Sequence, residues 1–437
     1  MSTQISIFDG ANKYVNDKPI RLIECFAGYG SQALALKYLG IPFEHHRIAE
    51  WAVKSIQAYK DMHFPNDDTD YSCGMSFDNV IDYLYERGIS ADYNKPMTRD
   101  QIKRMGENKC RTVYNNIKAT NNLVSVCNVK AKDLEITDTD RFTYLLTYSF
   151  PCQDLSQGGQ QKGMEKGSGT RSGLLWEIER ILKECEQLPQ MLIMENVPQI
   201  INPKNKKSFN DWFCALEKLG YRSYYDVLNA KDYGVPQNRE RCFMVSILGD
   251  YSYNFPKPIP LIKELKDLIE QEVDEEFYLS EKGLKYLFDR MPKLVNVENN
   301  GETYDSVIRP PHGWNKGEWE KSKIMPTIDT GMGKWHILLG KSNIAVFDSY
   351  NARQINGDVL GTLTASCANN GSGTFCVKQG EKPVRRLTPR ECFRFMGVKD
   401  EDFERVARNQ SKSSLYHLAG DSIVVNVLMA IFKELFM

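Results

Sequence analysis

The chain lacks three features that would place it among secreted, zinc-binding or membrane proteins. Its eleven cysteines are scattered and odd in number, and no two of them form a C-x-x-C pair. This pattern excludes a disulfide framework and a thiolate zinc site, and it favours a reducing compartment. Residues 1–18 are polar and mixed in charge, and no run of residues approaches membrane-spanning length. We therefore expect a cytoplasmic protein without membrane contacts.

The chain also lacks a large net charge of either sign. Its 56 Lys and Arg residues offset 57 Asp and Glu residues, which leaves a formal charge of −1 at pH 7. No global basic field indicates a polyanionic partner, so any nucleic-acid binding has to come from local basic patches. With 437 residues, of which 41% are hydrophobic, the chain is long enough for two or three soluble domains.

Short apolar strands alternate with helices over the first half of the chain. This pattern predicts an α/β fold with a doubly wound, mainly parallel sheet. The expected strands are residues 21–26, 43–50, 142–150, 191–194 and 241–248, and the expected helices include 32–39, 174–182 and 212–219.

Two regions interrupt this alternation and suggest the domain boundaries. Residues 60–130 are rich in Asn, Asp, Lys and Tyr, with a weak helical pattern, which indicates a subdomain inserted into a domain of residues 1–250. Residues 251–384 begin with a proline-rich, linker-like run and are expected to form a second, smaller domain of mixed structure. Apolar helical character returns within residues 385–437.

A glycine turn follows the first strand. Gly28 and Gly30 stand between that strand and the next helix, where glycines let a cofactor approach the backbone. Glu50 ends the next strand, and its carboxylate can accept hydrogen bonds from ribose hydroxyls. The spacing of Gly28, Gly30, Ala33 and Glu50 also satisfies the dinucleotide fingerprint, so these residues fit a nicotinamide enzyme and a nucleoside-cofactor methyltransferase equally well.

Cys152 is the candidate nucleophile. It follows the apolar run 142–150 and precedes a segment rich in Gly, Gln and Ser that ends at Gly173. A thiol at the carboxyl end of a buried strand, facing a loop, is where a doubly wound protein places such a group. The alternative is that Cys is a common buried residue, but the companions of Cys152 in the chain outweigh it.

Three further segments carry polar side chains that could meet Cys152. Glu195 ends an apolar strand and is expected in the same crevice, although a strand-end Glu is also often simply exposed. Arg239 and Arg241 alternate before a strand, which suits phosphate or base-edge recognition, although such a string alone is somewhat more often a solvated charge cluster. Residues 385–397 form a basic, aromatic helix that begins at Thr388-Pro389, and residues 420–426 are a turn into the last helix.

Taken together, these segments resemble the DNA cytosine-5 methyltransferases of bacterial and phage modification systems in order, composition and spacing. The resemblance implies the S-adenosylmethionine-dependent methyltransferase fold, with residues 251–384 as the target-recognition domain and 385–437 bracing it and returning to the catalytic domain. It implies that Cys152 is the nucleophile, that Glu195 engages the cytosine ring, and that Arg239 and Arg241 are the paired arginines of the family. Within residues 251–384, a short signature begins at Thr362.

The resemblance also implies a set of ligand contacts. The residues expected to bind S-adenosylmethionine are Phe26, Ala27, Gly28, Gly30, Glu50, Trp51, Asp133, Leu134, Pro151, Leu174, Asp421 and Ser422. Those expected to bind DNA are Gln153, Ser156, Lys162, Arg171 and Thr362. The chemistry requires no metal. The expected partner is double-stranded DNA bound by a monomer, and a cognate restriction endonuclease that acts separately stays open.

The chain departs from the usual pattern of this family at three positions, because Asp421, Asn426 and Ser31 replace its usual Asn, Pro and Gly. Rival interpretations are a nicotinamide-dependent oxidoreductase, which leaves Cys152 and Glu195 unused, and a catalytically idle nucleic-acid-binding relative, which their presence disfavours. A tRNA cytosine-5 methyltransferase is the third, but the Cys-Phe-Thr tripeptide that marks that branch is absent.

Overall fold

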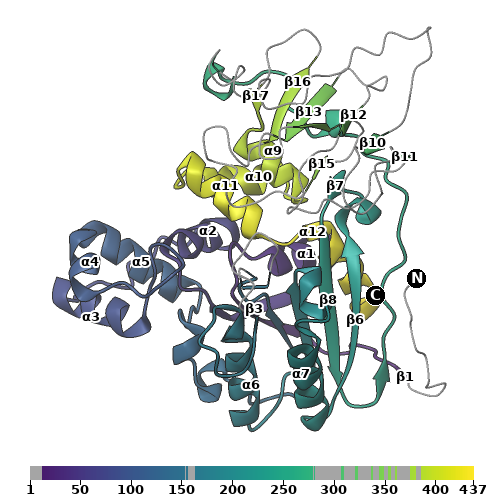
Figure 1. Ribbon diagram of the computed structural model, residues 1–437. Coiled ribbons are helices and arrows are strands. Elements are labelled where there is room, and N and C mark those ends of the chain that lie inside the picture. Colours follow the sequence, from purple (N-terminus) through teal and green to yellow (C-terminus); the bar gives the residue numbers. More distant parts are fainter. Residues whose placement is uncertain are drawn as a thin grey trace, which may run out of the picture.

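Figure 1 shows the computed structural model of the chain. It describes residues 12–152, 154–155, 163–278, 280 and 385–437, and between 281 and 384 it describes the backbone of short strands only. Within the last region the strands are β10 (Val307–Arg309), β11 (Glu320–Ser322), β12 (His336–Ile337), β13 (Ile344–Asp348), β14 (Arg353–Ile355), β15 (Leu360–Gly361) and β16 (Phe375–Gln379).

A six-stranded sheet with the order β3-β2-β4-β5-β8-β6 forms the centre of the molecule. Its strands are β2 (Ile20–Cys25), β3 (Phe43–Ala49), β4 (Thr143–Tyr148), β5 (Met191–Asn196), β6 (Tyr221–Asn229) and β8 (Glu240–Leu248). The first four pair in parallel, whereas β8 runs antiparallel to both β5 and β6. The predicted doubly wound, mainly parallel α/β fold is therefore confirmed, with an antiparallel edge that the sequence pattern did not indicate.

Helices cover both faces of this sheet, as Figure 1 shows. On one face α1 (Ser31–Leu39) and α12 (Val425–Phe436) bury apolar side chains in a single core cluster. On the other face α6 (Leu175–Glu184) and α7 (Lys206–Lys218) pack Trp176 and Trp212 edge to face over β4 and β5. Because β4 and β5 are buried along their whole length, they read as continuous apolar runs rather than alternating ones.

The C-terminal residues belong to this core. The helices α9 (Pro389–Phe395), α10 (Asp400–Ala407) and α11 (Lys412–Asp421) precede α12. The expected start of α9 is observed. Thr388 is the N-cap and forms a reciprocal capping box with Glu391, and Pro389 takes the first helical position. Residues Lys412–Phe436 are long and apolar enough to cross a membrane by length and composition alone, but 72% of the apolar 18-residue window within them is buried inside the fold, as in a core helix.

The inserted segment is more helical than its sequence suggests. It begins in the last turn of α2 (Val53–His63) and contains α3 (Phe77–Arg87), α4 (Arg99–Arg104) and α5 (Glu107–Ala119). Helices α3 to α5 enclose their own apolar cluster, which includes Val80, Leu84 and Ile117. A small core of this kind needs few apolar residues per helix, which explains why the helical pattern in the sequence is weak.

Short strands connect the remaining parts of the chain. β1 (Asn12–Lys13) pairs with β9 (Tyr251–Ser252), and β15 pairs with β7 (Gln237–Asn238), just before β8. β17 (Arg385–Arg386) pairs with β16. Within β17, Arg385 forms a buried ion pair with Glu391 of α9 at 2.7 Å. This pair fixes the entry of the C-terminal helices against the strands that precede them.

Gly30 is the glycine of the first turn that the fold most needs. It is the N-cap of α1 with φ +82°, and a Cβ there would lie 2.7 Å from the Tyr59 ring and closer still to the His63 ring. We expect Gly30→Ala to lower the free energy of unfolding by about 3 kcal/mol, through the left-handed backbone and the overpacking together. Urea denaturation measures this change.

Gly40 provides the matched control for this prediction. It is the C-cap of the same helix with φ +69°, and no atom lies within 4 Å of its hypothetical Cβ. Gly40→Ala should therefore cost only the backbone term, about 1 kcal/mol. Equal losses for the two variants would contradict the packing explanation.

Candidate functional site

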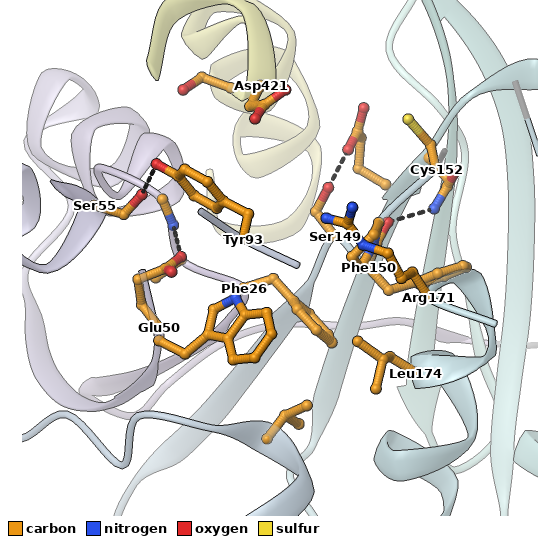
Figure 2. Close-up of a pocket in the computed structure, with 18 of the residues that line it drawn as sticks. Phe26, Glu50, Ser55, Tyr93, Ser149, Phe150, Cys152, Arg171, Leu174 and Asp421 are labelled. Atoms are coloured by element: carbon orange, nitrogen blue, oxygen red, sulfur yellow. Dashed lines mark hydrogen bonds between the residues drawn. The ribbon is translucent and has the colours of Figure 1, made fainter. Parts of the chain in front are cut away.

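A cleft of about 350 Å³ opens at the carboxyl ends of the parallel strands. Residues that follow β2, β3, β4 and β5 line it, and residues at the C-terminal end of α11 and just after it close it from the other side. In doubly wound folds ligands bind at this edge, because the loops that follow parallel strands meet there. Figure 2 shows the side chains that face the cleft.

The turn after β2 and the end of β3 form one half of the cleft. Phe26 and Gly28 have φ values of +61° and +57°, so the backbone of the turn is left-handed at both residues. The Gly28 N–H donates to Glu50 Oε2 at 2.9 Å, and the Ala52 N–H donates to Glu50 Oε1 at 2.8 Å. Burial and then the nearby Asp421 raise the pKa of Glu50 to about 7. The Glu50 carboxyl is thus rigidly held with lone pairs still available to a ligand.

Apolar side chains wall the same half of the cleft. Phe26 and Leu174 face one another across it in Figure 2, and Trp51, Val126 and Pro151 complete the lining. A flat heterocycle fits between such walls, while the carboxylate of Glu50 accepts hydrogen bonds from hydroxyl groups beside it. This donor and acceptor set fits a nucleoside-containing cofactor.

Cys152, Glu195 and Arg241 come together in the other half of the cleft. Glu195 ends β5 and forms an ion pair with Arg241 on β8, where Oε1 lies 3.1 Å from Nε. Its second oxygen accepts a hydrogen bond from the Ser149 hydroxyl, two residues before Pro151. The strand ends of β4, β5 and β8 thus bring a thiol, a carboxylate and a guanidinium to one place, as the sequence predicted.

The backbone around Cys152 is fixed by neighbouring side chains. Asn196 Nδ2 donates to the Phe150 carbonyl at 2.9 Å, and the Ser172 hydroxyl donates to the Pro151 carbonyl at 2.7 Å. Burial raises the pKa of the Cys152 thiol, and Arg241 opposes that rise. In the ligand-free protein at pH 7 the thiol is therefore protonated, and a nucleophile has to be generated when substrate is present.

Arg239 has a different position from Arg241. It is buried, and its Nη2 donates to the carbonyls of Gly420 at 3.0 Å and Ser422 at 2.8 Å. Burial and the proximity of Arg241 lower its pKa to about 9. Arg239 thus joins the start of β8 to the C-terminal end of α11, which carries Asp421 into the cleft.

Most of the predicted site residues line the cleft. These are Phe26, Ala27, Gly28, Glu50, Trp51, Pro151, Cys152, Arg171, Leu174, Glu195, Arg239, Arg241, Asp421 and Ser422. Gln153, Ser156, Lys162 and Thr362 lie outside the described residues. Arg171 donates from Nη1 to Asn94 Oδ1 at 2.8 Å, so in this structure it contacts the inserted segment.

Three predicted residues do not line the cleft. Gly30 packs against Tyr59 and His63, as described above. Asp133 lies in a short helical turn, η2 (Ala131–Leu134), where its carboxylate accepts from the Lys130 N–H at 2.9 Å. Leu134 is buried, and its carbonyl is bonded to His46. The wall expected from Asp133 and Leu134 is instead made by the residues that precede and begin η1 (Val126–Asn128).

The sequence did not indicate several other lining residues. They are Ser55, Tyr93, Asn94, Ser125, Val126, Cys127 and Ser149. Tyr93 and Asn94 lie in the inserted segment, where no motif marks them. Only Ser149 had a local signal, because it immediately precedes the Phe150-Pro151-Cys152 run.

Comparisons with known proteins agree with this geometry. Residues 99–437 match the family C-5 cytosine-specific DNA methylase. The type II methyltransferase M2.ScrFI of Lactococcus lactis subsp. cremoris is 34% identical, over 95% of this chain and 99% of the relative. The orphan methyltransferase M.SssI of Spiroplasma monobiae is also 34% identical, over 96% of this chain and 97% of the relative.

Solved structures share the fold. The crystal structure of the Dnmt2 methyltransferase of S. pombe has a TM-score of 0.56 and 15% sequence identity, over 95% of this chain and 97% of that one. The Entamoeba histolytica methyltransferase EhMeth also has a TM-score of 0.56, with 14% identity over 96% and 98% of the two chains.

Proposed function

Because this chain belongs to the C-5 cytosine-specific DNA methylase family and is a DNA cytosine-5 methyltransferase, we propose that it transfers the methyl group of S-adenosylmethionine through a covalent adduct of Cys152 with a flipped-out cytosine. The observation that supports this proposal is that Cys152, Glu195 and Arg241 lie together beside the apolar half of the cleft, here called the slot. In this proposal the enzyme acts on double-stranded DNA as a monomer, either with a cognate restriction endonuclease or as an orphan enzyme.

The slot walled by Phe26, Trp51 and Leu174 would hold the adenine, and Glu50 would accept from the ribose hydroxyls. Asp421 and Ser422 close the end of the slot toward Cys152. When bound, S-adenosylmethionine supplies an electrophilic methyl group on its sulfonium sulfur. A nicotinamide coenzyme would use the same slot, but it would leave the cluster of Cys152, Glu195 and Arg241 without a role.

Cys152 starts the chemistry. Its thiol gives up its proton to water or a neighbouring base as its sulfur forms a bond to carbon 6 of cytosine. The electron pair of the 5,6 double bond then makes carbon 5 nucleophilic enough to take the methyl group. A base then removes the proton from carbon 5, the double bond returns, and the thiolate leaves. Ordered water or a side chain takes that proton.

Glu195 and Arg241 hold the ring during these steps. Glu195 supplies or shares a proton at ring nitrogen 3 and accepts from the exocyclic amine, which selects cytosine over thymine. Arg241 donates to the 2-oxo group. Arg239 does not reach the ring in this proposal, because its guanidinium bonds the Gly420 and Ser422 carbonyls and positions Asp421.

The target base has to leave the duplex before it can reach Cys152, at a cost of a few kcal/mol of unstacking. We infer that the segment from Gln153 to Arg171, with Ser156, Lys162 and other polar groups, contacts the DNA backbone around the vacated site. Residues 251–384, with Thr362 in their short signature, would read the target sequence. In this proposal a part of the chain separate from the pocket reads the bases in the DNA grooves. The reaction and the target sequence can therefore vary independently.

Bisulfite sequencing tests the whole proposal. DNA from a host that expresses the protein should carry 5-methylcytosine at one fixed position of a short recurring sequence. DNA from a host that expresses the Cys152→Ser variant is the control. Unmodified DNA in both hosts, with methylated tRNA in the first, would contradict the proposal in favour of the RNA-directed reaction.

Glu50 gives a test of the cofactor. S-adenosylhomocysteine should raise the melting temperature, because a ligand that binds only the folded protein stabilises it. Glu50→Gln should weaken binding about tenfold at pH 8, through loss of hydrogen bonds to a charged group. Because the pKa of Glu50 is raised to about 7 and the ionised form is the better acceptor, wild-type affinity should rise between pH 6 and pH 8, and the variant should lose this dependence. Calorimetry measures both effects.

Glu86→Gln on the exposed end of α3 is the matched control and should leave binding unchanged. A melting-temperature increase with NADH but not with S-adenosylmethionine or its product would contradict the assignment of the cofactor.

A further inference from the structure

Helices α3 and α4 of the inserted subdomain are joined by a loop, residues 89–97, that reaches the functional cleft. The Ser90 N–H donates to the Trp51 carbonyl at 2.8 Å, and the Val53 N–H donates to the Ser90 carbonyl at 2.9 Å. The loop is therefore hydrogen-bonded directly to the segment that follows Glu50. Its tip carries the only two residues between α3 and α4 that line the cleft, Tyr93 and Asn94.

Tyr93 stands inside the cleft. Figure 2 shows its ring between Glu50 and Asp421, on the side opposite Leu174. Its hydroxyl is hydrogen-bonded to Ser55 Oγ on α2 at 2.9 Å, and its ring packs edge to face against His417 on α11, with centroids 4.6 Å apart. Nδ1 of the same His417 lies 3.1 Å from Asp421 Oδ2. Tyr93 thus joins both sides of the cofactor half of the cleft.

The backbone at Tyr93 supports a functional reason for this position. Its φ is +62°, a left-handed conformation that a large side chain keeps only where the surrounding contacts impose it. Asp92 imposes it from one side, because its Oδ1 accepts from the Asn94 N–H at 3.0 Å. The Ser90 hydroxyl donates to the Lys95 carbonyl at 2.8 Å and closes the loop from the other side.

Asn94 connects the loop to the segment that leads away from Cys152. Its Oδ1 accepts from Arg171 Nη1 at 2.8 Å. The Arg171 N–H in turn donates to Asp154 Oδ2 at 2.9 Å, two residues after the nucleophile. A continuous chain of contacts therefore runs from the inserted subdomain to the backbone beside Cys152.

We propose that the inserted subdomain is part of the methyl-donor site, with Tyr93 as a wall that contacts the bound cofactor and Asn94 as the latch that holds Arg171. This inference rests on the proposed use of S-adenosylmethionine. An aromatic face beside two carboxyl groups suits a cationic ligand, and the donor is cationic at its sulfur. In this proposal the subdomain contributes to cofactor binding at the catalytic site and is not merely a peripheral insertion.

Binding of S-adenosylhomocysteine to variants of the full chain tests the proposal. Tyr93→Ala should weaken binding about tenfold, which corresponds to the loss of one well-packed aromatic contact. The Michaelis constant for S-adenosylmethionine should rise by a similar factor, whereas kcat at saturating donor should change less. Tyr85→Ala is the matched control, since Tyr85 lies on α3 of the same subdomain with 51% of its surface exposed, and it should behave as wild type.

The latch has its own readout. Asn94→Ala should leave binding of S-adenosylhomocysteine within about twofold, because Asn94 lies at the exposed edge of the cleft, and it should raise the Michaelis constant for DNA by freeing Arg171.

The outcomes separate this inference from the proposed function. Wild-type protein that fails to bind S-adenosylhomocysteine would overturn both. Wild-type binding together with unchanged binding by Tyr93→Ala would overturn the inference alone. If the melting temperature of ligand-free Tyr93→Ala falls by more than a few degrees, Tyr93→Leu, which keeps the apolar bulk against His417, takes its place, and the same two results decide.

Discussion

Replacement of Cys152 by serine should lower the rate of methyl transfer by about four orders of magnitude or more, because a hydroxyl cannot supply the nucleophile that a thiolate supplies. Cofactor and DNA binding should stay close to wild type, since the substitution changes one atom of a side chain that has only partial burial. Transfer of a labelled methyl group to DNA measures the rate.

A covalent adduct gives a second measure of the same role. DNA with 5-fluorocytosine at the target should form a denaturation-resistant complex with the wild-type protein, because fluorine cannot leave as a proton. Cys214→Ser, at an exposed position on α7, should form the complex normally. Robust methylation by Cys152→Ser, or an adduct that forms without the Cys152 thiol, would refute the assignment.

The protonated state of Cys152 also predicts a pH dependence. Burial raises the pKa of this thiol, so alkylation of the ligand-free protein at Cys152 should be slow at pH 7. The rate should increase as the pH rises above the pKa of an ordinary thiol. Mass spectrometry after iodoacetamide treatment distinguishes Cys152 from the other cysteines.

Glu195→Gln should give the second-largest loss, about 10²- to 10³-fold in kcat, because the amide cannot deliver a proton to ring nitrogen 3. The variant keeps the shape of the side chain and one oxygen for the Ser149 hydroxyl, but it removes the charge that pairs with Arg241 at 3.1 Å. Single-turnover rates at saturating DNA and donor measure the chemical step directly.

Glu217→Gln, at an exposed position on α7, is the control for this substitution and should retain the wild-type rate. A loss confined to DNA affinity, with an unchanged single-turnover rate, would mean that Glu195 binds the base without taking part in proton transfer.

The predicted residues that the structure brings together in the cleft are mainly those at the ends of parallel strands. Glu50, Cys152 and Glu195 follow or end β3, β4 and β5, and the topology of a parallel sheet brings such positions to one edge whatever the intervening loops contain. Arg241 reaches the same edge from an antiparallel strand, and only its spacing from Arg239 marked it in advance.

The residues that the sequence missed depend on contacts between loops. Tyr93 and Asn94 approach the cleft because helices α3 to α5 fold around their own core and aim the loop at α11, and no periodicity records that orientation. Asp133 and Leu134 were expected to line the cofactor half of the cleft, whereas Ser125 and Val126 line the cleft instead, since the chain turns away into η2 before it reaches β4. The proposed DNA contacts at Gln153, Ser156, Lys162 and Thr362 stay predictions.

The packing of α12 against α1 has a consequence for how the protein is made. Helix α1 forms near the start of synthesis, but the apolar side chains that cover it arrive with the last residues, and Asp421 arrives with them. Contacts so distant in sequence form late and slowly. A nascent chain that has not yet reached the end of α11 therefore has an uncovered hydrophobic helix and a cleft that lacks Asp421, so it needs protection against aggregation until α12 has been synthesised.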